Sequence, residues 1–135
     1  MSGRLIGGHT GIMELKGTQI ELKAEDFDGA LLFVEDIPEF FDEEGVTAYF
    51  EYLAQKGILQ IINGIIIGKS NEDGFFSKRA RIIRQIVSDK YCRSIPIIYG
   101  LNFGHSSPTC ILPYGALAGL DCEKKEFSII ESGVI

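Results

Sequence analysis

An acidic residue and a histidine each stand just beyond an apolar run of this sequence, and together they could do acid–base chemistry. Glu35 follows the run 30–34, and His105 follows the run 95–99 through a glycine-containing turn. A carboxylate can orient an imidazole, which then acts as the general base for a nucleophile. Both residues also have ordinary structural explanations: an acid that ends a strand, and a loop histidine that is hydrogen-bonded to backbone.

The third member of a hydrolytic triad, the nucleophile, is not evident. The sequence contains no Gly-x-Ser-x-Gly motif. Ser106, Ser107 and Cys110 are too close in sequence to His105 to be presented easily to its imidazole. A metal site would draw on Cys110, His9 and His105, but no pair of these ligands has a recognised metal-binding spacing. We therefore expect neither a metal nor a cofactor.

Three apolar runs predict strands that are covered on both faces: 30–34, 64–68 and 95–99. Pro38 prevents the first strand from continuing. A helical segment separates each pair of strands, and such crossovers are right-handed, so the three strands should run parallel. Parallel strands bring their carboxyl ends to one edge, where open α/β sheets build their sites. We therefore expect the carboxylate and the imidazole to lie within hydrogen-bonding distance.

Two amphipathic helices are predicted between these strands. Asp42 is a suitable N-cap, and the apolar spacing that follows it repeats on one helical face until Gly57 stops the helix. The apolar positions of that face are Val46, Tyr49, Phe50 and Leu53. A polar loop over 69–74 leads into a second helix over about 75–90. Its basic residues, which we expect to form a solvated face, are Lys78, Arg81 and Arg84.

The two ends of the chain show weaker patterns. In the glycine-rich segment 4–17, the Gly7-Gly8 pair allows a close backbone approach or a turn with positive φ, and an ordinary turn is the favoured interpretation. Thr10 could cap the residues that follow, and 18–22 alternates as a short strand. A Cys-Glu-Lys-Lys turn joins 116–121 to 126–131 as a C-terminal β-hairpin. The predicted fold is a single α/β domain over residues 1–135, with a small, mainly parallel sheet, two flanking helices and that hairpin.

Composition limits the classes of partner. The chain has 135 residues, enough for one domain with its own core, and a net charge of −6 that argues against nucleic acid. Its three cysteines contain no Cys-x-x-Cys pair, which indicates reduced thiols in a cytoplasmic protein. No signal peptide is recognised and no apolar run approaches membrane-spanning length, so we expect no membrane association.

Short segments in a fixed order carry a resemblance to a known family. They are Leu5-Ile-Gly-Gly8 with Gly17-Thr18, Phe27-Asp-Gly-Ala-Leu-Leu-Phe-Val-Glu-Asp36, Gly57-Ile-Leu, Gly64-Ile-Ile-Ile-Gly68, Ile95-Pro-Ile-Ile-Tyr-Gly100, Phe103-Gly-His105 and Leu112-Pro-Tyr-Gly115. Each segment alone is unspecific, whereas the ordered set covers nearly the whole chain. The sequence resembles the C-terminal half of the LD-carboxypeptidase family of serine peptidases, which includes the microcin C self-immunity peptidases.

This resemblance implies roles for the residues at the predicted sheet edge. It implies that Glu35 and His105 are the acid and the base of a Ser-His-Glu triad, carried on a swivelling β/β/α domain. Their neighbours Asp36, Gly104 and Ser106 are candidates for contacts with the substrate. The family's serine and oxyanion hole belong to an N-terminal α/β domain, and nothing in this chain matches it. We therefore expect the chain to act with its own N-terminal domain and to be inactive alone.

The resemblance also implies the class of substrate. Family members cleave peptides with unusual linkages: the L,D bond of muramoyl tetrapeptides, or the bond that joins the microcin C peptide to its nucleotide portion. Gly8-His9-Thr10 and His105-Ser-Ser-Pro108 look more like the microcin-immunity branch than like the peptidoglycan-recycling enzymes. The alternative is a non-catalytic peptide- or ligand-binding domain that keeps the fold. An apolar face left without its N-terminal domain could also pair two copies as a homodimer.

Overall fold

A curled sheet forms the centre of the fold in this computed structural model, which describes residues 1–70 and 76–134. Its strands follow the order β4-β3-β2-β1-β5-β6. The strands are β1 (Ser2–Gly8), β2 (Leu31–Val34), β3 (Gly64–Gly68), β4 (Ile97–Leu101), β5 (Leu117–Asp121) and β6 (Glu126–Ile129). β1 to β4 run parallel, and β5 and β6 form an antiparallel hairpin beside β1. The predicted parallel strands and the C-terminal hairpin are confirmed.

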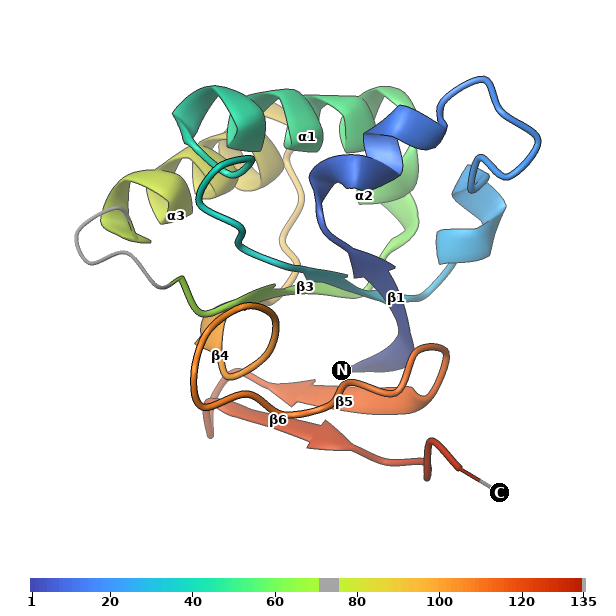
Figure 1. Ribbon diagram of the computed structural model, residues 1–135, viewed down its shortest axis with the longest axis vertical. Helices are drawn as coiled ribbons and strands as arrows, with labels where there is room; N and C mark the ends of the chain where they lie inside the picture. Colours follow the sequence, from blue (N-terminus) through green and yellow to red (C-terminus); the bar gives the residue numbers. More distant parts are fainter. Residues whose placement is uncertain (71–75, 135) are drawn as a thin grey trace.

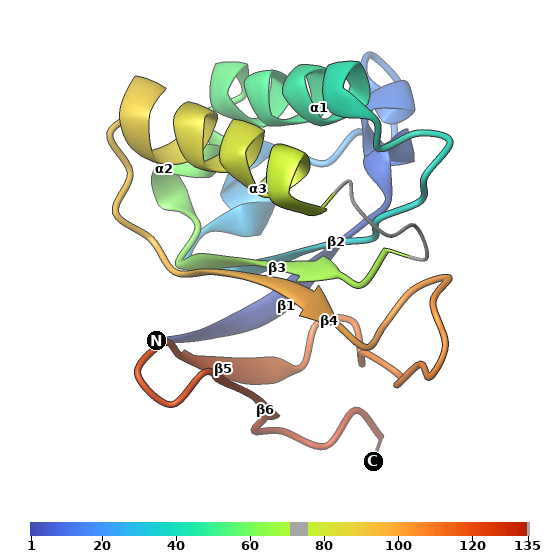
Figure 2. The same ribbon diagram turned by 90° about the vertical axis from the view of Figure 1, so that its left-hand side faces the viewer.

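The helices gather over one face of the sheet (Figure 1). They are α1 (Glu43–Gln55), α2 (Ile58–Ile61), α3 (Phe76–Arg84), the 3-10 helices η1 (Thr10–Leu15) and η2 (Ala24–Phe27), and the π-helix η3 (Gln85–Lys90). Figure 2 shows the hairpin β5–β6 on the side opposite to the helices, below the parallel strands β1 to β4. Within the described residues, no helix is long and apolar enough to cross a membrane.

The curled sheet separates two apolar cores. The larger core lies between the sheet and the helices and contains Leu32 and Val34 of β2 with the apolar face of α1. The smaller core lies on the hairpin side. Its buried members are Leu5, Leu31, Ile66, Phe103, Ala118 and Leu120. Because successive side chains of β2 alternate between the two cores, the chain leaving this strand can present neighbouring residues to opposite faces.

The first predicted helix is confirmed as α1. Its N-cap is Asp42, whose Oδ1 accepts a hydrogen bond from the Gly45 N–H at 2.7 Å. The predicted apolar face is buried without exception. The chain turns after the helix at Gly57, which has a φ of 77° that glycine adopts without strain.

The second predicted helix is confirmed in place, with one change of geometry. Residues 71–75 of the predicted loop and helix start lie outside the described residues. α3 passes directly into the π-helix η3, which ends at Lys90 as expected for the predicted helix. Three of its basic residues are exposed as predicted: Lys78, Arg81 and Arg84. Arg79 is buried with 1% exposure, which the amphipathic pattern did not predict.

The glycine-rich N-terminus is a central strand, so its interpretation as an ordinary turn is wrong. β1 lies between β2 and β5. A Cβ at Gly7 would stand 1.8 Å from the Phe33 carbonyl oxygen, and one at Gly3 would stand 2.2 Å from the Gly29 carbonyl oxygen. Glycine therefore lets the backbones of β1 and β2 approach closely, which confirms at Gly7 the alternative of a close backbone approach. The same glycines remove the alternation of side chains by which a strand is recognised.

The short strand predicted over 18–22 is also wrong. The Thr18 N–H donates to the Leu15 carbonyl at 3.0 Å, and the Glu21 N–H donates to the Thr18 carbonyl at 3.3 Å, so this segment is a turn. The carboxylate of Glu21 is ion-paired with Lys56. The two backbone bonds are thus made within the turn, and the ion pair joins the turn to the end of α1.

The third predicted strand is displaced and less buried than expected. β4 covers Ile97–Leu101 rather than 95–99, and its side chains are half-buried or exposed. It stands at the end of the strand order. Pro96, which has no N–H to give to a ladder, precedes the strand and accepts from the Ile65 N–H at 2.9 Å. The prediction of a strand covered on both faces is wrong because β4 is an edge.

Candidate active site

The predicted contact between the carboxylate and the imidazole is confirmed. His105 Nδ1 and Glu35 Oε1 lie 2.5 Å apart, at the carboxyl edge of the parallel strands. Glu35 is anchored by its N–H, which donates to the Gly8 carbonyl at 2.9 Å. Two thirds of the His105 side chain is exposed (67%), whereas only 21% of the Glu35 side chain is. A sheltered acid thus orients an imidazole that a substrate or a second domain can reach.

His105 reaches Glu35 because its loop passes across the end of β3. A Cβ at Gly68, the last residue of that strand, would stand 2.9 Å from the Phe103 carbonyl oxygen. A Cβ at Gly104 would stand 2.7 Å from Glu35 Cγ, and Gly104 has a φ of 88°. Glycine at both positions therefore lets the loop lie directly on β3 and on the acid.

The loop is held in this place by packing and by its own hydrogen bonds. The Phe103 ring is buried and meets the Phe33 ring edge-on, with 6.2 Å between their centroids. The Cys110 N–H donates to the Asn102 carbonyl at 2.7 Å, which closes the loop around His105. The imidazole is therefore presented by an ordered segment.

Replacing Gly104 with alanine is expected to destabilise the site more than the same change at Gly100. Both glycines have a φ near 90° (88° and 89°), but nothing lies within 4 Å of a Cβ at Gly100. The positive φ alone costs an alanine about 1–2 kcal/mol of unfolding free energy. The collision with Glu35 should add roughly 1–3 kcal/mol. Denaturant unfolding of both variants tests this, and equal losses would contradict the close approach.

Asp36 is turned away from the surface. Its side chain is fully buried, and the Arg79 guanidinium donates through one nitrogen to both carboxylate oxygens, at 2.7 and 3.0 Å. The Tyr99 hydroxyl donates to the same carboxylate, and the Arg79 nitrogen also contacts Ser70 Oγ at 3.1 Å. A buried carboxylate requires such a partner. No pattern in the sequence singled out Arg79 or Tyr99, because their partner lies on a different element.

Burial, together with the Asp36 carboxylate beside it, raises the pKa of Tyr99 above its ordinary value. The phenol therefore keeps its proton across the neutral range and remains a donor. The Asp36 carboxylate is thus compensated by a full positive charge and a neutral hydroxyl.

The remaining candidates are distributed around this dyad. Ser106 follows His105 but is buried, and its Oγ has no hydrogen-bond partner among the described residues. Cys110 is exposed, and its Sγ contacts the Asn102 carbonyl. His9 caps η1 in place of the predicted Thr10, because its Nδ1 accepts from the Gly11 N–H at 2.9 Å. Across residues 1–70 and 76–134, no three His, Cys, Asp or Glu side chains are grouped to hold a metal ion.

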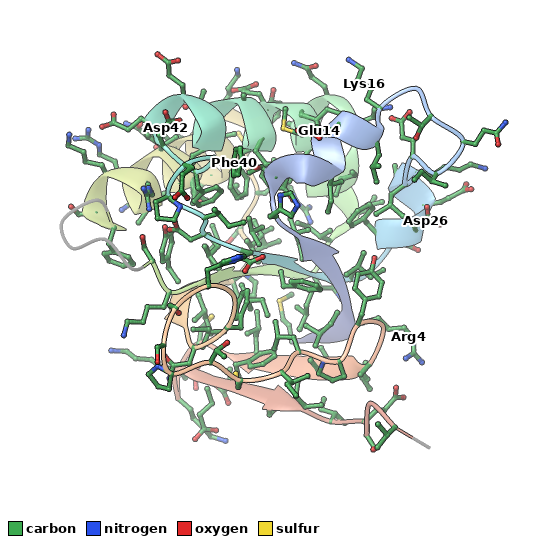
Figure 3. All side chains as sticks on the ribbon, viewed as in Figure 1. Arg4, Glu14, Lys16, Asp26, Phe40 and Asp42 are labelled. Carbon is green, nitrogen blue, oxygen red and sulfur yellow. The ribbon has the colours of Figure 1, made fainter. Side chains whose placement is uncertain are left out.

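A cavity lies at the same sheet edge, where η1 meets the start of α1. It has a volume of about 240 Å³. Its lining residues include Phe40 and Glu14, which Figure 3 labels together with the N-cap Asp42. The other lining residues are His9, Thr10, Gly11, Met13, Gly45 and Ala48. The cavity begins where β1 ends at Gly8, on the helix side of the sheet, and neither Glu35 nor His105 is among its lining residues.

Known proteins resemble this chain in sequence and in fold. A Bacillus subtilis protein named as a probable murein peptide carboxypeptidase is 29% identical over 135 residues, covering 98% of this chain and 40% of its own length. The microcin C7 self-immunity protein of Escherichia coli is 27% identical over 135 residues, covering 97% of this chain and 37% of its own length. The chain therefore spans less than half the length of these relatives.

A solved structure of the self-immunity protein, in complex with aspartyl sulfamoyl adenosine, has the same fold. It superposes with a TM-score of 0.82 at 24% identity, covering all of this chain (100%) and 39% of that chain. The mixed α/β fold with its curled sheet is thus confirmed. A profile of the LD-carboxypeptidase C-terminal domain matches residues 2–120. Since this match takes in nearly the whole chain, the chain belongs to the LD-carboxypeptidase C-terminal domain family.

Proposed function

We propose that this chain supplies the acid and the base of a Ser-His-Glu triad in a serine-type carboxypeptidase or amide hydrolase. The observation that carries the proposal is the 2.5 Å contact between His105 Nδ1 and Glu35 Oε1 at an exposed sheet edge. Membership of the LD-carboxypeptidase C-terminal domain family supports it. The nucleophilic serine and the oxyanion hole come from an N-terminal domain of the complete enzyme.

The proposed mechanism gives each group a step. When Nδ1–H donates to Glu35, Nε2 of His105 takes the proton of the serine hydroxyl as the serine oxygen attacks the substrate carbonyl. The resulting imidazolium, stabilised by the Glu35 carboxylate, gives that proton to the departing amine as the C–N bond breaks. Water then passes a proton to Nε2, attacks the acyl ester, and the serine oxygen leaves with the proton. Glu35 orients the imidazole throughout and does not itself take the proton.

The substrate class follows from the relatives and from the cavity. The relatives' names connect them with murein peptides and with microcin C7. The cavity of about 240 Å³ at the end of β1, with Phe40 and Glu14 among its lining residues, suits part of an extended ligand. We therefore assign peptides with unusual linkages as the substrate class. A peptide-nucleotide amide is the first substrate to assay, and an L,D-linked murein peptide is the second.

The 135-residue chain is expected to hydrolyse neither substrate by itself. An imidazole and a carboxylate lack the group that attacks the carbonyl and the donors that stabilise its oxyanion. The assay measures release of amine from an aminoacyl-nucleotide amide and from an L,D-tetrapeptide, with the chain alone and with the separately produced N-terminal portion added. Activity should appear only in the mixture or in the complete enzyme.

Two results would contradict the proposal. Hydrolysis by the chain alone that is lost with Ser106→Ala, Ser107→Ala or Cys110→Ala would place the nucleophile in this chain. Saturable binding of either ligand, with no hydrolysis by the complete enzyme, would identify a non-catalytic binding domain instead.

A further inference from the structure

Glu35 and Asp36 are neighbours in sequence, yet they point to opposite faces of the sheet. β2 sends Phe33 toward the smaller core and Val34 toward the helix-side core. The contacts of the next two residues continue this alternation: Glu35 meets the Gly104–His105 loop, whereas Asp36 meets Arg79 of α3 and Tyr99.

The segment that carries Glu35 has left the sheet ladder, because β2 ends at Val34. Its N–H still bonds to the Gly8 carbonyl at 2.9 Å. The next anchor is the side chain of Asp36, fully buried and bonded by Arg79, whose own side chain is 2% exposed. Without that anchor, the backbone bonds nearest to the acid would be the one at its own N–H and those that the Ile37 carbonyl accepts from the Phe40 and Phe41 N–H groups.

Two ties therefore join this segment to the chain around β4, one on each face of the sheet. Tyr99 bonds to Asp36 on the helix side, and His105 bonds to Glu35 on the other side. β3 lies between β2 and β4, so these two strands are not hydrogen-bonded to each other, and the two side-chain ties cross over β3. The first tie fixes the segment that the second tie uses.

We propose that Asp36, Arg79 and Tyr99 are positioning residues that hold Glu35 in the orientation that binds the His105 imidazole. This proposal rests on the proposed function, since it assigns these residues to the same acid–base pair. The buried arginine also supplies the positive charge that the buried Asp36 carboxylate requires. Asp36 thus acts through Glu35 and does not touch the substrate.

The tautomer of His105 reports on this orientation directly, without turnover. The chain has two histidines, so nitrogen-15 spectra of the labelled chain resolve both imidazoles. Nδ1 of His105 should carry the proton that is donated to Glu35. His9 is an internal reference of the opposite kind, because its Nδ1 accepts from the Gly11 N–H.

Tyr99→Phe and Asp36→Asn are expected to lower the ratio of Nδ1–H to Nε2–H tautomer at His105 by about two- to tenfold, the range set by loss of one hydrogen bond. Tyr91→Phe is the matched control. It also removes a phenol that donates to a carboxylate, Glu51 Oε2 at 2.8 Å, and that carboxylate is likewise paired with a cation, Lys90. This control should leave His105 unchanged.

Glu35→Ala separates failure of this proposal from failure of the proposed function. If Glu35→Ala leaves the His105 tautomer unchanged, the dyad itself is absent in solution, and both proposals are overturned. If Glu35→Ala shifts the tautomer while folded Tyr99→Phe behaves like Tyr91→Phe, only the positioning role is overturned. Should Asp36→Asn fail to fold, Tyr99→Phe decides alone, because it keeps the ring and its packing.

Discussion

Turnover of the complete enzyme is expected to fall by about 10⁴ when Glu35 is replaced with glutamine, equivalent to roughly 5 kcal/mol of activation free energy. The neutral glutamine amide no longer stabilises the imidazolium. Its N–H can also donate to Nδ1 of His105, and this tautomer has its proton on Nε2, so that Nε2 cannot take the proton of the serine. The fold should be retained, because glutamine has nearly the same size and 21% of the Glu35 side chain is exposed. The measurement is kcat and KM on the peptide-nucleotide amide.

The loss should appear in kcat, with KM little changed, since the acid acts on the imidazole and not on the bound substrate. Glu25→Gln, which removes an exposed carboxylate on η2, is the matched control and should retain full turnover. Near-normal turnover of Glu35→Gln would show that the carboxylate is a bystander and that the contact with His105 is structural.

A second large effect is expected for stability when Arg79 is replaced with methionine. Methionine keeps much of the length and the packing of the arginine but leaves the Asp36 carboxylate buried without its cation. Breaking a buried ion pair in this way costs about 3–5 kcal/mol of unfolding free energy. Urea unfolding of the chain, followed by circular dichroism, measures it.

The double variant Asp36→Asn with Arg79→Met tests the cause. If the uncompensated charge is responsible, neutralising the acid should recover much of the lost free energy, as expected for two groups in contact. Arg84→Met on the same helix is the matched control, because Arg84 is exposed, and it should change stability by no more than about 0.5 kcal/mol. Equal effects of Arg79→Met and Arg84→Met would contradict the assignment of a buried pair.

Local patterns predicted the elements that carry their own signal. The unbroken apolar runs of β2 and β3 and the capped, periodic face of α1 all appear where the sequence placed them. The edge that joins Glu35 to His105 was also predicted, because parallel connections have one handedness and parallel strands end together. These inferences need only neighbouring residues and a general rule of chain geometry.

The remaining features depend on contacts between distant residues. Arg79 shares a helix with exposed basic residues, and only the position of Asp36 on another element makes it buried. β1 is a strand because Gly7 fits against the Phe33 carbonyl, and the spacing of apolar residues in the sequence does not indicate that contact. The side chains of β4 are apolar in composition, yet its place at the edge of the sheet leaves them half-buried. Pairing partners, and not residue types, decide all three.

The edge position of β4 also determines how the dyad can be lost. Tyr99 and His105 both come from this strand and the loop after it, and a strand at the end of the order has one neighbour to hold it. Sub-global opening in proteins starts at such weakly covered elements and needs less free energy than complete unfolding. Peeling of β4 from β3 would break both ties to the Glu35–Asp36 segment in a single event. The population of assembled acid–base pairs is therefore governed by the local free energy of one edge strand, and amide exchange along β4 reads that population directly.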